Sequence, residues 1–245
     1  MSRKGNMGKR FFGFTSILDK YQFSKYQYFA LALVLLLGAA IRFYNLGEWS
    51  FWYDEIFTLR DIEGLKPPAL LLERPSLLLS AISVSLFGVS EWSARFVPAL
   101  IGVLSIPTLY FLVRTLFNPT IAILSVLLLA VSPWHLYWSQ NARFYTALLL
   151  FYTLALFAFY WGIEKDRPWY LVLFMVLFGL AVRERLFALF ILPVVAGYLI
   201  LVKILPFPKP PGLRMRNLMI IFIPGMIMAM ILGGNYVLDP SRLQL

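Results

Sequence analysis

Apolar residues in this chain come in long, nearly continuous runs, without the strict alternation that marks half-buried strands. A helix rises about 1.5 Å per residue, so a run of roughly 18 to 20 residues can cross the hydrocarbon core of a bilayer. We therefore expect the runs to form membrane-spanning helices. Seven candidate spans follow one another along the chain, at residues 26–44, 96–113, 120–138, 144–162, 168–182, 186–202 and 218–232.

One further apolar segment, residues 76–89, is the shortest, at about 21 Å as a helix. Ser76, Ser80 and Ser83 recur in it at helical spacing, so one face of the helix is polar. The length and this stripe favour a juxtamembrane or re-entrant helix over a span. If this segment does not cross, the later basic residues fall on the cytoplasmic side, as the positive-inside rule requires. They are Arg114, Lys165, Arg167, Lys203, Lys209, Arg214 and Arg216.

The composition supports the same fold class, since 60% of the residues are hydrophobic, 14% are charged and the mean hydropathy is +0.76. A soluble domain is closer to half apolar and a quarter charged. We expect an all-α integral membrane protein with about seven transmembrane helices, plus juxtamembrane helices in the first extracytoplasmic loop. The absence of cysteine excludes disulfides and thiolate-based metal or redox sites.

The net charge of +10 is explained by membrane topology, and we predict no nucleic acid partner. Residues 1–25 read as a basic cytoplasmic arm that also meets anionic headgroups. Residues 26–245 form one polytopic membrane domain, whose first extracytoplasmic loop covers about residues 45–93. We expect the plasma (inner) membrane as the location, with the N-terminus in the cytoplasm and the active loops outside it.

Polar residues suited to chemistry gather in the loops that this topology places outside the cytoplasm. They are Asp54, Glu55 and Arg74 in the first loop, Gln140, Arg143 and Tyr145 between the third and fourth spans, and Arg183, Glu184 and Arg185 between the fifth and sixth. A carboxylate can act as general base toward a hydroxyl, and arginines can bind a phosphate that gains charge as it leaves. Each group by itself also fits an ordinary role, as solvated surface, ion-pair turn or helix cap. The single histidine, His135, is interpreted as an interfacial residue among aromatic neighbours.

Two stretches, FGVSEWSARFVPALIG and SQNARFYTALLL, together with the Asp-Glu pair before them, resemble polytopic glycosyltransferases of the GT-C fold. The chain is similar to the dolichyl-phosphate-mannose protein mannosyltransferases and their bacterial relatives, including the lipid A aminoarabinose transferase. The resemblance covers roughly residues 26–205. It implies transfer of a sugar from a polyprenyl phosphate to an acceptor hydroxyl on the extracytoplasmic face, with inversion.

The resemblance also implies roles for individual residues. The first-loop acid is the family's expected base and corresponds to Asp54, with Glu55 beside it. Arg143 and Tyr145 match the family's Gln-x-Ala-Arg-x-Tyr loop, which begins here at Gln140. These residues and the remaining arginines would bind the donor phosphate.

The chain departs from the family pattern in three places. Arg74-Pro75-Ser76 stands where the family has His-Pro-Pro or Lys-Pro-Pro, and Arg183-Glu184-Arg185 stands where relatives often carry a histidine, which leaves the donor open. Relatives usually continue with more spans and often a soluble domain, whereas this chain stops near the seventh span. Four interpretations are compatible with this length: a truncated chain, a minimal enzyme, a half that needs a partner, and an inactive descendant.

The favoured function is a membrane glycosyltransferase or its catalytic module, and the alternative is a non-catalytic GT-C-like subunit of a larger membrane complex. A transporter has less support, because no paired interrupted helices are predicted. The expected partners are a polyprenyl-phosphate sugar, membrane lipids, an acceptor that is protein, lipid or glycan, and a partner membrane subunit if one completes the site. No cofactor motif is present; a divalent metal is compatible with this chemistry, but no metal-ligand spacing indicates one.

Overall fold

The computed structural model describes residues 25–64, 74–206 and 208–238, with the side chains of 228, 229 and 231–238 excepted. Over these residues the chain is helical, without strands. The elements are α2 (Lys25–Phe43), α3 (Tyr53–Gly64), α5 (Pro75–Phe87), α6 (Glu91–Leu116), α7 (Pro119–Val131), α8 (Pro133–Ser139), α9 (Tyr145–Glu164), α10 (Pro168–Glu184), η1 (Leu186–Phe190), α11 (Ile191–Ile204) and α12 (Met215–Leu238). The predicted basic arm lies almost wholly outside the described residues and stays a prediction.

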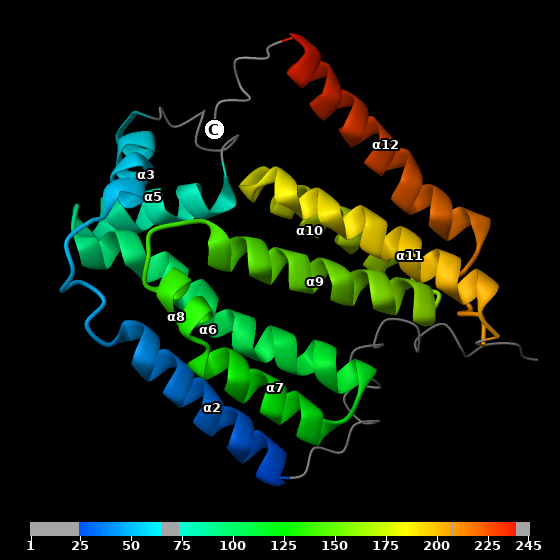
Figure 1. Ribbon diagram of the computed structural model, residues 1–245, viewed down its shortest axis with the longest axis horizontal. Helices are drawn as coiled ribbons and strands as arrows, with labels where there is room; N and C mark the ends of the chain where they lie inside the picture. Colours follow the sequence, from blue (N-terminus) through cyan, green and yellow to red (C-terminus); the bar gives the residue numbers. More distant parts are fainter. Residues whose placement is uncertain (1–24, 65–73, 207, 239–245) are drawn as a thin grey trace, which may run out of the picture.

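The long helices α2, α6, α7 and α9 lie side by side with their axes roughly aligned (Figure 1). α3 and α5 lie together at one end of this bundle. α9 and α10 pack against each other most extensively and enclose a core around Phe159, Phe174 and Phe178. A second core lies between α2, α6 and α7, around Ile106 and Val126. The two cores hold the bundle that carries the shorter elements at its end.

Four helical segments of the described chain are long and apolar enough to cross a membrane: α2, α6, α9 and the continuous stretch Leu186–Ile204. α7 and α8 make a fifth if the bent pair is counted as one broken span. α10 has only 17 residues, and in α12 the segment Met215–Ile227 is a shorter apolar helix. The predicted all-α membrane architecture is therefore found, but the count of seven spans is not confirmed.

The predicted span 120–138 is two helices, which meet at a 58° bend. Pro133 has no N–H group to continue the hydrogen bonding of α7. Ser132 ends α7 and caps α8, because its hydroxyl accepts the N–H of His135. The break places α8 across the end of the bundle, where it leads into the loop predicted to bind the donor (Figure 1).

Arg42, near the end of α2, stabilises this bend from a fully buried position. Its Nη1 donates to Ala130 O at 3.0 Å and its Nη2 to Leu129 O at 3.2 Å, so a cation faces the negative end of α7. Nη2 also lies 2.8 Å from Nδ1 of His135, which must accept because arginine only donates. His135 is 1% exposed. The expectation of an interfacial histidine is therefore wrong: α8 turns this side chain inward against Arg42.

α5 is a short helix of 13 residues, in agreement with the prediction that residues 76–89 are too short for a span. Its serine face is buried against the protein, and the Ser83 hydroxyl donates to Ser93 O at 2.7 Å. The opposite face, with Leu79, Ile82 and Leu86, is exposed. The polar stripe of α5 thus serves to attach the helix to its neighbours.

Candidate active site

Four segments that are far apart in sequence meet at the end of the bundle that carries α3 and α5 (Figure 1). They are the first turns of α3, the first turn of α5, the connection between α8 and α9, and the junction between α10 and η1. Direct contacts join them: Asp54 with Arg143, Glu55 with Ala142, Ser76 with Glu184, and Arg185 with Phe144. The structure therefore brings the three predicted loop regions to one place.

Glu55 is fully buried and forms the centre of this arrangement. Arg95 of α6 binds both of its carboxylate oxygens, with Nε–Oε1 at 2.9 Å and Nη2–Oε2 at 2.7 Å. The N–H of Ala142 donates to the same carboxylate at 2.7 Å. Glu55 thus ties α3 both to α6 and to the α8–α9 connection. Such a bidentate, charge-assisted pair fixes orientation as well as position.

Arg95 was not among the predicted site residues, although it lies in the stretch FGVSEWSARFVPALIG that carried the resemblance. Its Nη1 also donates to Trp49 O at 2.7 Å and to Leu46 O at 3.3 Å. The signal in the sequence was a single arginine in the first turns of an apolar helix. Because a charge is rarely buried unless it is paired, that arginine indicated a buried acidic partner.

Asp54 points away from Glu55 and is partly accessible, with 35% of its side chain exposed. Arg143 holds it in place: Nη2 lies 3.5 Å from the Asp54 carboxylate, and Nη1 donates to the Asp54 carbonyl at 3.0 Å. The Nε of Arg143 is buried and has no hydrogen-bond partner among the residues that the structure describes. Asp54 is thus a carboxylate at the surface of the site, and Arg143 keeps a donor uncommitted.

Two arginines lie over the ring of Phe144, and a third lines a cavity with it. The guanidinium carbons of Arg185 and Arg143 lie 4.4 Å and 5.4 Å from its centroid. Arg74 lines a small cavity that Arg143 and Phe144 also line, and it pairs with Asp61 at 2.8 Å. Burial lowers the pKa of Arg185, and the positive charges of Arg74 and Arg143 lower it further. These three cations, here called the arginine cluster, repel one another, so an anion between them would be stabilised.

Three other predicted site residues, Glu184, Gln140 and Arg183, do not belong to the arginine cluster. Glu184 is buried and accepts two hydrogen bonds from Ser76. The Gln140 side chain donates to the carbonyls at the end of α2, among them Tyr44 O at 3.1 Å, and so attaches α8 to α2. Arg183 is exposed, and its side chain makes no ion pair or hydrogen bond with the residues that the structure describes. Their predicted part in phosphate binding stays a prediction.

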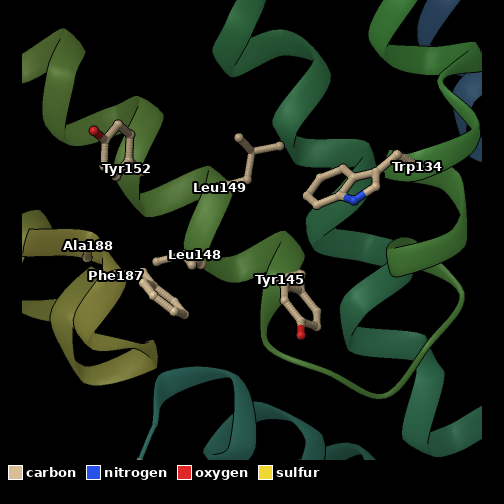
Figure 2. A pocket seen from close by; sticks show the side chains of 7 residues that line it. All are labelled: Trp134, Tyr145, Leu148, Leu149, Tyr152, Phe187 and Ala188. Atoms are coloured by element: carbon tan, nitrogen blue, oxygen red, sulfur yellow. The ribbon is translucent and has the colours of Figure 1, made fainter. Parts of the chain in front are cut away.

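An apolar cavity of about 290 Å³ lies beside the arginine cluster, between α8, α9 and η1 (Figure 2). It is lined by Trp134, Tyr145, Leu148, Leu149, Tyr152, Phe187 and Ala188. Tyr145 connects the two regions, because its ring stacks on Phe144 with centroids 4.3 Å apart. The volume is at the low end of the roughly 300–1,000 Å³ typical of ligand pockets, so the cavity fits only part of a long apolar ligand.

The described residues contain no group of three or more His, Asp or Glu side chains that could hold a metal ion. Among the described residues, the charged groups at the site are instead the accessible carboxylates of Asp54 and Asp61, the latter paired with Arg74, and three guanidinium groups. Together they can accept a proton at Asp54 and bind an anion at the arginine cluster, next to an apolar surface.

Comparison with known proteins places the chain in a family. An uncharacterized protein of Aquifex aeolicus (strain VF5) is 29% identical over 219 residues, which cover 82% of this chain and 42% of that protein. The chain therefore spans less than half the length of this relative. No solved structure matches. The family model of the dolichyl-phosphate-mannose-protein mannosyltransferases matches residues 76–228, more than half of the chain, and the protein belongs to this family of GT-C membrane glycosyltransferases.

Proposed function

We propose that this chain is a membrane glycosyltransferase, or the membrane module of one, which transfers a sugar from a polyprenyl phosphate to an acceptor hydroxyl. One observation carries the proposal above the others. Asp54 and Arg143, 89 residues apart in sequence, meet at 3.5 Å at the edge of the arginine cluster. A base and an anion-binding group are thereby adjacent, as this reaction needs.

The donor has a charged and an apolar part, and the site offers a matching surface for each. The phosphate would lie among Arg74, Arg143 and Arg185, where the uncommitted Nε of Arg143 can donate to it. The first isoprene units would follow the apolar cavity beside Tyr145 (Figure 2). Most of the tail would stay in the bilayer, because the cavity holds only a part of it.

The proposed reaction is a single displacement with inversion. The acceptor oxygen gives its proton to the Asp54 carboxylate and forms a bond to the anomeric carbon of the sugar. The bond from that carbon to the phosphate oxygen breaks, and its electron pair stays on the polyprenyl phosphate. The arginine cluster stabilises the charge that develops on this leaving group. Glu55 takes no proton in this scheme, since its carboxylate is held by Arg95; it positions α3.

Several features follow from the proposal. The site would face the extracytoplasmic side, with the N-terminus in the cytoplasm and the protein in the plasma (inner) membrane. The acceptor is a protein, lipid or glycan hydroxyl, and a partner membrane subunit would complete the acceptor side if one is needed. Neither a metal ion nor nucleic acid has a part in the scheme.

The test is sugar transfer by the full chain in lipid vesicles, with polyprenyl-phosphate mannose as the donor that the family name suggests. Asp54→Asn keeps the shape but removes the basicity, so it should lower transfer by roughly 10²–10⁴-fold and leave donor binding nearly intact. Asp166→Asn is the matched control: Asp166 is also a carboxylate paired with arginines, in the connection between α9 and α10. Full transfer by Asp54→Asn would contradict the catalytic assignment and favour the structural-subunit alternative.

A further inference from the structure

Helix α5 begins without a side-chain cap from its own first residues. Its N-cap residue, Arg74, makes no capping hydrogen bond, although Ser, Thr, Asp or Asn usually satisfies the free N–H groups of the first turn. The missing acceptor is Glu184, at the end of α10 and 108 residues after Ser76. Its Oε1 accepts the N–H of Ser76 at 2.6 Å and its Oε2 accepts the Ser76 hydroxyl at 2.6 Å.

This link is enclosed by protein, since Glu184 is 1% exposed and Ser76 is buried as well. A carboxylate at the N-terminal end of a helix is stabilised by the helix dipole, and here it also receives two short hydrogen bonds. Arg74 lies two residues before Ser76, and Arg185 directly follows Glu184. Both belong to the arginine cluster, so the link determines how far apart two of the three cations lie.

We propose that Glu184 is a positioning residue, which holds the first turn of α5 against the end of α10 and thereby sets the spacing of Arg74 and Arg185 around the anion site. The inference rests on the proposed function for the identity of the anion, the donor phosphate. The positioning itself concerns the folded chain and does not depend on sugar transfer.

The surroundings of Glu184 also make the charge of this link depend on pH. Burial raises the pKa of Glu184, which lies beyond the predicted span 168–182, to about 7; the hydrogen bonds from Ser76 and the charge of Arg74 act in the opposite direction. The charged and titratable groups around the link are Arg74 at the start of α5, Asp54 and Asp61 on α3, Arg143 and Tyr145 at the start of α9, and Arg183 and Arg185 beside Glu184 itself.

Protonation of Glu184 can occur without loss of the link. A carboxyl group still accepts the Ser76 N–H through its carbonyl oxygen and can donate its O–H to the Ser76 hydroxyl oxygen. Protonation removes one negative charge beside the arginine cluster. An anion should therefore bind more tightly below pH 7 than above it, and its binding should be accompanied by uptake of a proton.

Two substitutions separate position from charge. Glu184→Gln is isosteric and neutral; its amide can accept from the Ser76 N–H and donate to the hydroxyl, so it should keep the link. Glu184→Ala should remove the link altogether. The matched controls are Glu164→Gln and Glu164→Ala, because Glu164 also accepts a hydroxyl hydrogen bond, from Tyr198 at 2.7 Å, at the other end of α9.

The first measurement is the separation of α5 and α10 in the full chain in lipid nanodiscs. Spin labels at Leu79→Cys and Val176→Cys, two exposed positions, report it without interference, because the chain has no native cysteine. We expect Glu184→Ala to lengthen and broaden the distance distribution, and Glu184→Gln and both Glu164 variants to leave it unchanged. An unchanged distribution in Glu184→Ala would overturn the proposal.

The second measurement is the dissociation constant, between pH 6 and pH 8, of methyl farnesyl phosphate, a phosphodiester whose charge stays constant over this range, unlike that of a phosphomonoester. The wild type should bind more weakly as the pH rises, Glu184→Gln should bind tightly throughout, and Glu184→Ala should bind at least about tenfold more weakly. If Glu184→Ala does not fold, Ser76→Ala takes its place in both measurements. This variant loses the hydrogen bond from the Ser76 hydroxyl to Glu184. Wild-type distances and affinity in Ser76→Ala would contradict the positioning role, whereas absence of sugar transfer in the wild type would contradict only the proposed function.

Discussion

Asp54 and Glu55 are adjacent in sequence but lie in different environments, because successive side chains on a helix point about 100° apart. Glu55 turns into the protein and binds Arg95 and the Ala142 N–H, while Asp54 stays partly exposed beside Arg143. A carboxylate with access to solvent and substrate suits a base, and one enclosed by donors suits a structural link. The two acids therefore call for different experiments.

For Glu55, we expect a loss of stability as well as of activity. Glu55→Ala leaves Arg95 buried without its partner, and breaking a buried pair in this way costs about 3–5 kcal/mol in the free energy of unfolding. The measurement is unfolding of the full chain in mixed micelles with increasing denaturing detergent. The exposed pair of Asp61 with Arg74 is the control, since Asp61→Ala should cost at most about 1 kcal/mol. Equal losses for the two variants would mean that the Glu55–Arg95 pair is unimportant.

For the arginine cluster, we expect a larger KM for the donor and a lower kcat when Arg143 or Arg185 becomes alanine. A charge-assisted contact with phosphate contributes about 1.5–3 kcal/mol, which corresponds to a ten- to a hundredfold change. Arg→Lys should restore only a part, because lysine lacks the planar fork of guanidinium. Arg216→Ala is the control, since Arg216 is an exposed arginine that pairs with Asp166 at the connection between α9 and α10. Donor kinetics like those of the wild type in both cluster variants would assign these arginines to folding instead.

At the scale of secondary structure elements, the bend between α7 and α8 depends on a close approach to α6. A Cβ atom on Gly102 of α6 would meet Ser139 Oγ and come within 2.9 Å of Ser139 Cβ and 3.1 Å of Arg42 Nε. α8 can therefore lie across the end of the bundle only because this position has no side chain. The Arg42 contacts with Ala130 O and Leu129 O then fix the direction of the bend.

Gly102→Ala should destabilise the protein by about 1–3 kcal/mol, the usual cost of overpacking, and should lower donor affinity because α8 carries the donor loop. Gly179→Ala is the matched control: this glycine is also helical, but a Cβ there meets nothing within 4 Å. Alanine has the higher helix propensity, so the control should be neutral or more stable by up to about 1 kcal/mol. Thermal denaturation of both variants checks this, and equal melting temperatures would show that α8 does not need the close approach.

At the scale of the whole molecule, the open question is which end of the bundle faces the cytoplasm. The candidate site lies at the end that carries α3, α5 and α8 (Figure 1). The positive-inside rule places the basic connection between α11 and α12 in the cytoplasm. Because the chain has no cysteine, single cysteines can be introduced and labelled with an impermeant reagent in intact cells.

We expect labelling from outside at Trp49→Cys, beside the site, and protection at Lys209→Cys, both of which are exposed positions. Permeabilised cells provide the control, since both positions should then react. Labelling of Lys209→Cys in intact cells would reverse the topology and with it the extracytoplasmic location of the proposed reaction.

The sequence by itself determined the fold class, because long apolar runs can satisfy their backbone groups in a membrane only as helices. It also determined the family, through the stretches around Arg95 and Arg143, and the shortness of α5. The number of spans was not determined by the sequence. Residues 120–138 form one mostly apolar run in which Pro133 permits a bend, but only the structure shows that the run breaks into two helices there, with Arg42 bound to the end of the first.

The tertiary structure alone decided the partners of the buried charges. The sequence shows that Glu55, Arg95, Ser76 and Glu184 are polar residues with apolar neighbours. It does not show which of them pair with one another. Those pairs join positions 40 and 108 residues apart, so no local spacing predicts them. The physical reason is that a buried charge must find its partner wherever packing brings one close, and packing is a property of the whole bundle.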